Sequence, residues 1–170
     1  MKKVTILLLC IFFSFLGFAD TKKFNFGSPV FQANAFIPEK YTCEGANLSP
    51  AFYWENPPTT TKSFVVIIED TEVENNPWVQ WVLFNIPAHI RNLTEGEIPQ
   101  GAINGKNSWG LIGYKSPCPP VGTSHRYLFK LYALDIVLPL TNSATKDEVV
   151  KAMEYHVVGM SEFAGNFSRE

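Results

Sequence analysis

The chain has 170 residues, of which 46% are hydrophobic and 18% charged, and its formal net charge at pH 7 is −2. This length allows one domain with a sizeable core. Because its charges are nearly balanced, the chain lacks the strong positive field of nucleic-acid-binding proteins. The sequence contains no internal repeat and no low-complexity tract, which excludes a repeat protein.

Residues 1–19 have the layout of a secretory signal peptide. A pair of lysines precedes the almost entirely apolar run Val4–Phe18, and small residues stand three and one positions before Asp20. The run is short for a membrane-spanning helix, which takes about 20 residues, although an uncleaved membrane anchor is the alternative. We therefore expect cleavage before Asp20 and a periplasmic or secreted protein.

The expected mature chain, residues 20–170, keeps 12 basic and 16 acidic side chains after loss of Lys2 and Lys3, a formal net charge of −4. No later segment is apolar enough to span a membrane, so we expect no stable membrane insertion after cleavage.

Two cysteines remain in this mature chain, Cys43 and Cys118. An even pair in an exported protein favours a disulfide, and two free buried thiols are the alternative. A disulfide closing about 75 residues would stabilise the fold by roughly 4 to 4.5 kcal/mol in the chain-entropy model. Two cysteines with scattered histidines do not have the spacing of a zinc site, so no metal or cofactor is expected.

Apolar segments separated by turn residues follow one another from Phe24 to Pro87. Two short strands are predicted within Phe24–Phe36 and one at Phe52–Trp54. Ser63–Asp70 is nearly continuous in apolar residues, which predicts a strand buried on both faces. Val79–Ile86 is predicted as its hairpin partner, with Asp70, Trp78 and Gln80 at the mouth of the hairpin.

The second half of the chain contains a long irregular connection, one alternating strand and one helix. Ala88–Lys106 has no strong periodicity. From His125 the apolar residues alternate with polar ones, which predicts a strand with Tyr127 on the same face as His125. A capping box starts at Thr145, and apolar residues at helical spacing as far as Met160 predict a helix that ends near Gly159. That helix would include His156 at the polar edge of its packing face, and Phe163–Phe167 is predicted as a short last strand.

One long motif carries a resemblance to a known family. Asn107–Asp135 reads N-S-W-G-L-I-G-Y-K-S-P-C-P-P-V-G-T-S-H-R-Y-L-F-K-L-Y-A-L-D, and upstream the chain has T-C-E-G-A-N-L-S-P from Thr42. Both resemble the phosphatidylethanolamine-binding protein family, and most closely its bacterial branch, often called Raf-kinase-inhibitor-like. Strands separated by turns already predict a sandwich or barrel. The resemblance, over about residues 24–170, implies a mainly β Greek-key sandwich of two antiparallel sheets with a C-terminal helix at its side.

The resemblance also implies a pocket for a small anion such as a phosphorylated head group. The implied ligand-binding residues are Asp70, Trp78, Gln80, Tyr114, Pro119, Pro120, His125 and Tyr127. Alternation in W-V-Q-W places Trp78 and Gln80 on one face and Trp81 on the other.

Two departures from the family pattern fall in this pocket. Asp70 matches the first acid of the family's D-P-D-A-P, but Thr71 and Glu72 replace the residues that follow. Gln80 stands where the family has a histidine. An amide donates two hydrogen bonds but has no charge, so we expect weaker or altered anion affinity.

The residue types allow three functional hypotheses. A protonated His125 is suited to binding an anion. Asp70 belongs to the anion pocket only as the resemblance implies, and an acid at a strand end is otherwise often only solvated. The first hypothesis is an exported, non-enzymatic binding protein for a phosphate or carboxylate. The second is a protease or kinase inhibitor, or another protein-interaction module, that acts through the Pro-rich pocket rim. A hydrolase is disfavoured because no Ser or Thr lies in an activating motif. A homodimer is compatible with either of the first two.

Overall fold

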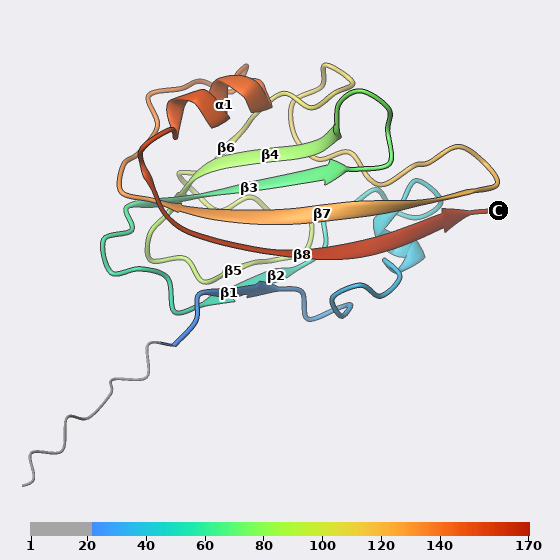
Figure 1. The fold of residues 1–170 in the computed structure, drawn as a ribbon, viewed down its shortest axis with the longest axis horizontal. Coiled ribbons are helices and arrows are strands. Elements are labelled where there is room, and N and C mark those ends of the chain that lie inside the picture. Colours follow the sequence, from blue (N-terminus) through green and yellow to red (C-terminus); the bar gives the residue numbers. More distant parts are fainter. Residues whose placement is uncertain (1–21) are drawn as a thin grey trace, which may run out of the picture.

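The computed structural model describes residues 22–170, which form two antiparallel β-sheets packed face to face with one α-helix on the far side of the larger sheet (Figure 1). This is the mainly β architecture that the sequence predicts. The expected signal peptide and its cleavage site lie outside the described residues. The elements in chain order are β1 (Asn25–Gly27), a 3-10 turn η1 (Glu39–Tyr41), β2 (Phe52–Glu55), β3 (Ser63–Asp70), β4 (Trp78–Pro87), β5 (Asn92–Leu93), β6 (Ile103–Asn104), β7 (Thr123–Leu134), α1 (Lys146–Ala152) and β8 (Val157–Arg169).

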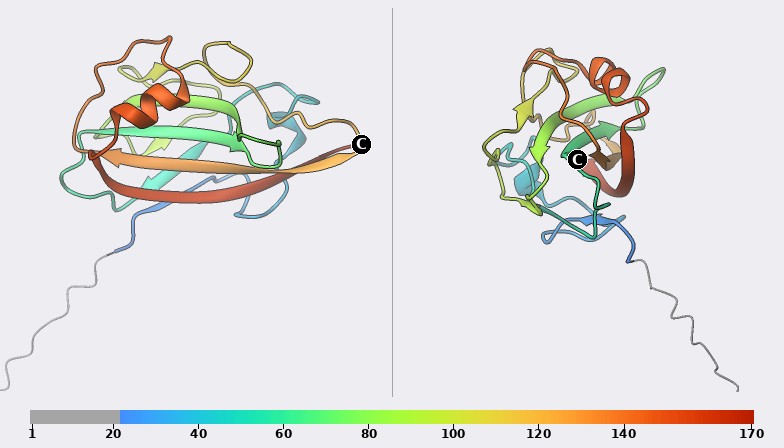
Figure 2. Two further views of the ribbon diagram at one scale, coloured as in Figure 1. Left: turned by 45° about the horizontal axis from the view of Figure 1, so that its top comes forward. Right: turned by 90° about the vertical axis from the view of Figure 1, so that its left-hand side faces the viewer.

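The larger sheet has the strand order β6-β4-β3-β7-β8 and the smaller one the order β1-β2-β5. Strand β3 is central and every one of its residues is buried, which agrees with its continuous apolar sequence. The smaller sheet covers one face of the larger sheet, and α1 covers part of the other (Figure 2).

The core between the sheets is mainly aromatic. The rings of Phe129 and Phe163 stack with centroids 4.9 Å apart, and Phe26 from β1 meets Phe163 edge to face at 5.2 Å. Trp54 from β2 packs against Phe64 from β3. Such pairs hold the smaller sheet on the larger one, because each buries a large apolar area.

A second apolar cluster lies between the larger sheet and α1. Val65, Ile67 and Val82 contribute from the sheet, and Val149 and Met153 from the helical segment. The predicted capping box is present: the side chain of Thr145 accepts from the backbone of Glu148, whose carboxylate accepts in turn from the Thr145 backbone.

The helix is shorter than the sequence predicts. It ends at Ala152, and Tyr155 then takes a left-handed backbone conformation with φ 67°. Strand β8 begins at Val157 and pairs with β7 along nearly its whole length. The prediction of a helix to Gly159 was wrong because this long-range pairing outweighs the local helical spacing. His156 lies after the helix, where its ring binds Asp135 at 2.9 Å.

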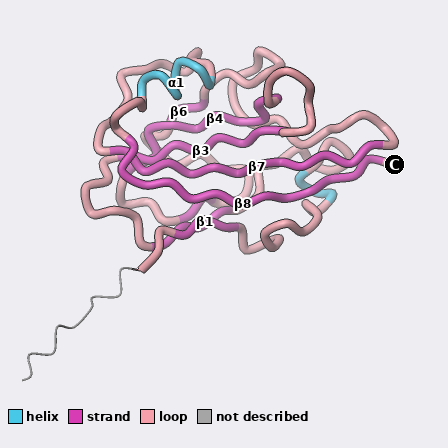
Figure 3. Tube along the Cα trace, in the orientation of Figure 1, coloured by secondary structure: helices cyan, strands magenta, loops and turns pink. Residues whose placement is uncertain are grey.

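Two smaller predictions also need correction. The segment after β1 does not form a second early strand, and Phe36 makes only a single bridge to Asn166 of β8. The long connection Ala88–Lys106 holds two short strands, β5 and β6. Strands make up most of the regular secondary structure (Figure 3), and none of the helices within residues 22–170 is long and apolar enough to cross a membrane.

Candidate functional site

Three strands have their ends close together at the end of the larger sheet that lies farthest from the α1–β8 turn (Figure 1). Asp70 is the last residue of β3, Trp78 is the first of β4, and His125 lies near the start of β7. Because neighbouring strands are antiparallel, Asp70 lies opposite both Trp78 and Tyr127 in the sheet register. The fold therefore brings together side chains that are distant in sequence.

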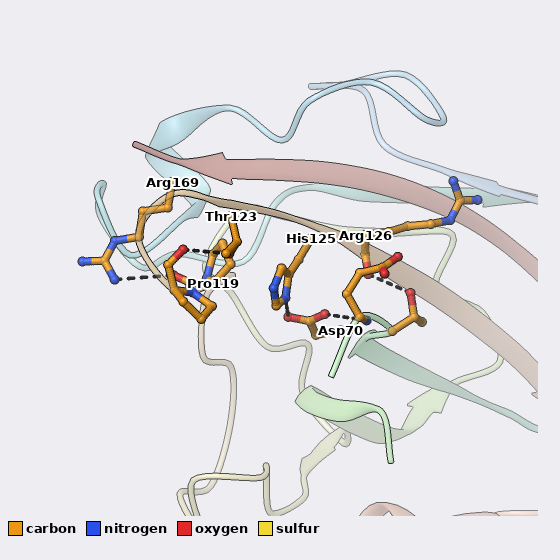
Figure 4. A network of polar contacts seen from close by, with 9 residues as sticks. Asp70, Pro119, Thr123, His125, Arg126 and Arg169 are labelled. Carbon is orange, nitrogen blue, oxygen red and sulfur yellow. Dashed lines mark hydrogen bonds and ion pairs between the residues drawn. The ribbon is translucent and has the colours of Figure 1, made fainter. Parts of the chain in front are cut away.

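Asp70 and His125 form a close pair in this cluster (Figure 4). Oδ2 of Asp70 lies 2.7 Å from Nδ1 of His125, and Oδ1 accepts from the backbone N–H of Glu72 at 3.0 Å. The side chains are 5% and 14% exposed. A carboxylate can only accept, so Nδ1 of His125 carries the hydrogen and Nε2 is the atom left for a ligand.

A β-bulge at Gln80 shapes the opposite wall. Ile68 pairs with Trp81 and Glu69 pairs with Val79, so Gln80 has no partner on β3. Strict alternation predicts Trp81 on the face opposite Gln80. Because of the bulge, Trp81 and Gln80 instead lie on the same face of the sheet. Trp81 packs in the core with Tyr127, and Gln80 lines the pocket beside Trp78.

The amide of Gln80 is bound to the neighbouring loop. In the orientation that satisfies its hydrogen bonds, its nitrogen donates to the carbonyl oxygens of Lys115 at 2.9 Å and Ser116 at 3.3 Å. The backbone carbonyl of Gln80 also accepts from the N–H of Lys115 at 3.0 Å. Gln80 therefore holds the loop in place, and its two N–H groups are already used.

These groups surround a cavity of about 190 Å³. Larger hollows of about 280 and 500 Å³ beside α1, and one of about 230 Å³ beside β7 and β8, contain no paired acid and histidine. The rings of Trp78 and Trp109 meet edge to face at the mouth, with centroids 5.4 Å apart. The cavity is lined by Asp70, Val73, Trp78, Gln80, Trp109, Cys118, Pro119, Pro120 and His125.

The predicted disulfide is present and fixes one wall of the cavity. Cys43 and Cys118 are bonded, with Cα atoms 5.3 Å apart. The N–H of Cys43 donates to the carbonyl of Pro117 at 3.0 Å, and the N–H of Ser116 donates to Oδ1 of Asn47 at 2.9 Å. One covalent and two hydrogen-bonded links therefore join the proline-rich loop to an early segment of the chain.

Six of the eight predicted site residues line the cavity, and two lie behind it. Tyr114 donates its hydroxyl to the carbonyl of Tyr41 at 3.0 Å and meets Trp81 edge to face. Tyr127 is fully buried in the core, and its hydroxyl has no hydrogen-bond partner. Burial and the nearby Asp70 carboxylate raise the pKa of Tyr127 far above its usual value. Both tyrosines therefore support the pocket wall without reaching the cavity.

Sequence reasoning missed three residues of the lining: Val73, Trp109 and, as a lining residue, Cys118. Trp109 stands in the N-S-W-G part of the motif, and that position was the available signal. Among the described residues, no group of three or more His, Cys, Asp or Glu side chains is placed to hold a metal ion.

Comparison with known proteins covers most of the chain. Residues 27–168 match the family model described as phosphatidylethanolamine-binding protein. A UPF0098 protein of Methanothermobacter thermautotrophicus is 41% identical over 150 residues, which cover 85% of this chain and 99% of the relative. A UPF0098 protein of Chlamydia pneumoniae is 39% identical, with 84% of this chain and 97% of the relative covered.

Solved structures agree with the sequence comparison. A putative phosphatidylethanolamine-binding protein homologue from Chlamydia trachomatis superposes with a TM-score of 0.83 at 35% identity, over 87% of this chain and 99% of that one. Escherichia coli YbcL, described as a new member of the mammalian PEBP family, gives 0.82 at 26% identity, over 88% of this chain and all of that one. The two-sheet fold with its helix is thus shared with both.

Proposed function

Because the chain belongs to the phosphatidylethanolamine-binding protein family, we propose that the pocket formed by β3, β4 and β7 binds a small anion, a phosphate or the head group of a phosphorylated molecule. The protein acts by binding rather than by catalysis. One observation supports this most directly: a histidine held by a buried carboxylate faces a cavity of head-group size.

The Asp70–His125 pair explains how such a pocket attracts an anion. In the neutral imidazole, the Nδ1–H group donates its hydrogen bond to Asp70. Nε2 then has only a lone pair, which repels an anion. In the imidazolium, Nε2 becomes a charged donor, and charge-assisted hydrogen bonds are about twice as strong as neutral ones. Anion binding is therefore expected to be coupled to protonation of His125.

The composition of the lining favours binding over turnover. None of the nine lining residues is a Ser or Thr, and Cys118 is in the disulfide, so the lining offers His125 no hydroxyl or thiol to activate. A dyad without a nucleophile holds a ligand but does not form a covalent intermediate with it.

A phosphate titration tests the proposal. Phosphate should change the fluorescence of Trp78 or Trp109 and the NMR signals of the His125 ring, and His125→Ala should weaken binding at least about tenfold. His89 is exposed in the loop after β4, and His89→Ala is the matched control that should leave the affinity unchanged. Absence of binding by phosphate and by a phosphorylated head group would overturn the proposal.

A second candidate function is capture of a protein by the rim of the pocket. The segments that supply Trp109 and Pro120 to the cavity lining also expose apolar side chains: Leu111, Ile112 and Val121 are 56%, 52% and 65% exposed. Exposed apolar side chains around a polar centre are typical of interaction sites. Anion-independent capture of one protein, lost in Ile112→Asp and kept in His125→Ala, would favour this function.

We propose export from the sequence of residues 1–19, which predicts a cleaved signal peptide. A disulfide in the folded protein is consistent with an oxidising compartment. N-terminal sequencing of the protein recovered from the producing cell should begin at Asp20, and recovery with Met1 intact from the cytosol would contradict export.

A further inference from the structure

The cavity lining is rich in hydrogen-bond acceptors for a site that binds an anion. Both N–H groups of the Gln80 amide have acceptors in the loop, the carbonyls of Lys115 and Ser116. In that orientation the other end of the amide is the carbonyl oxygen, which can only accept, and Gln80 lines the cavity although the residue is 1% exposed. The carboxylate of Asp70, on a side chain that is 5% exposed, is a second acceptor.

The charged donors in the same lining are few. The lining contains no lysine and no arginine, and its two prolines have no N–H. Arg126 extends away from the Asp70–His125 pair (Figure 4), and Arg169 is held by Glu44 and the carbonyl of Pro119. Protonated His125 is the cation that the lining supplies, and the indole N–H groups of the two tryptophans are neutral donors.

We propose that the pocket selects an anion that itself carries a proton, namely the monoanion of phosphate, of a phosphate monoester or of a phosphonate. The P–OH group of such a ligand donates to the carbonyl oxygen of Gln80 or to Asp70, while its ionised oxygens accept from His125. This inference rests on the proposed function, because it names the class of anion that the same site takes.

Two physical reasons support this selection. A sulfate or carboxylate ion offers only acceptors, so against Gln80 and Asp70 it would place oxygens together with no hydrogen between them. Buried acceptors without a hydrogen-bond donor would make the binding free energy less favourable. Asp70 and protonated His125 also cancel in charge, so the lining does not compensate a dianion, whereas a monoanion gains the hydrogen bond from His125 with less repulsion.

A pair of matched ligands tests the proposal on the unaltered protein. Methylphosphonate near pH 6 and methanesulfonate are tetrahedral anions of the same shape with one methyl group, and the phosphonate monoanion carries a proton that the sulfonate lacks. We expect calorimetric titration to show methylphosphonate binding at least about tenfold tighter. Inorganic phosphate and sulfate should differ in the same direction.

Variants identify the acceptor. Gln80→Met keeps the length of the side chain and removes the carbonyl oxygen, so the ratio of phosphonate to sulfonate affinity should fall. Gln100, an exposed glutamine before β6, provides the control Gln100→Met, which should keep the ratio. The ligand pair gives an answer even if Gln80→Met does not fold.

The outcomes separate this inference from the function on which it rests. Equal binding of methylphosphonate and methanesulfonate would overturn the selection of a protonated anion and leave an anion pocket. Failure of all four anions to bind would overturn the anion pocket itself. Strong preference for the phosphonate that is lost in Gln80→Met would establish both.

Discussion

Asp70 and His125 are 55 residues apart in the sequence, yet the carboxylate of one lies 2.7 Å from the imidazole of the other. The contact exists because β3 and β7 are neighbours in the larger sheet and run in opposite directions. It determines which ring nitrogen faces the cavity, and through that the charge that a ligand meets.

The first prediction concerns protons taken up on binding. Phosphate binding near pH 7 should be accompanied by net proton uptake, because the bound state requires the imidazolium form of His125 and a protonated ligand. Calorimetry in two buffers of different ionisation enthalpy measures this uptake. His125→Gln should reduce this proton uptake. Equal heats of phosphate binding in the two buffers would contradict the coupling.

The second prediction concerns Glu69, a buried acid on the face of the larger sheet that α1 covers. Its carboxylate binds the ammonium groups of Lys130 and Lys146, each at 2.6 Å. Burial alone would raise the pKa of Glu69, but the hydrogen bonds from the two lysines outweigh burial and hold the pKa below its usual value. Glu69→Gln should lower the free energy of unfolding at pH 7 by about 1–3 kcal/mol, between the values for exposed and buried pairs.

The pH dependence of this effect has a definite sign. A depressed pKa in the folded state contributes stability above the unfolded-state pKa, and this contribution is lost as pH falls through the folded-state pKa. The difference between wild type and Glu69→Gln in urea denaturation should therefore be full at pH 7 and shrink below about pH 4.5. Glu162→Gln, at an exposed site on β8, should show neither effect.

The third prediction concerns the disulfide. Cleavage of the Cys43–Cys118 bond, which closes a loop of sequence separation 75, should lower the free energy of unfolding by about 4 to 4.5 kcal/mol in the chain-entropy model. Urea denaturation with and without a reductant measures the loss. The double variant Cys43→Ser with Cys118→Ser should be as unstable as the reduced protein and insensitive to the reductant; if it matches the oxidised protein, the bond does not stabilise the fold.

The fourth prediction concerns the start of α1. Thr145→Ala removes the side chain that accepts from the Glu148 N–H, so it should lower stability by about 1 kcal/mol. Thermal denaturation should show a lower midpoint for this variant than for Thr59→Ala, which changes an exposed threonine outside any helix. Equal midpoints would mean that the capping box does not stabilise the protein.

The sequence predicts the two central strands well because their patterns are local. The continuous apolar run of β3 and the alternation along β7 each determine which faces are buried, whatever lies next to them. The same alternation correctly puts Tyr127 on the His125 face. It does not reveal that the cavity stops short of Tyr127, because the proline-rich loop forms the remaining wall.

The incorrect predictions depend on contacts between distant segments. The apolar spacing from Val149 to Met160 suits a helix, but residues from Val157 onward gain a ladder of hydrogen bonds with β7. Likewise, the role of Gln80 depends on its register against β3 and on the carbonyl groups of Lys115 and Ser116. Neither partner can be inferred from residues near Gln80 in the sequence.

The bulge at Gln80 also makes the site sensitive to chain length. At Gln80, strand β4 holds one residue more than a regular ladder against Ile68 and Glu69 requires, so deletion of Gln80 would give regular pairing at this point. The same deletion would leave Trp78 opposite Asp70 but remove the hydrogen bonds that Gln80 makes to the loop. A shorter, more regular β4 would therefore keep the sandwich and the Asp70–His125 pair, but the loop that forms one wall of the cavity would lose its attachment to the strand.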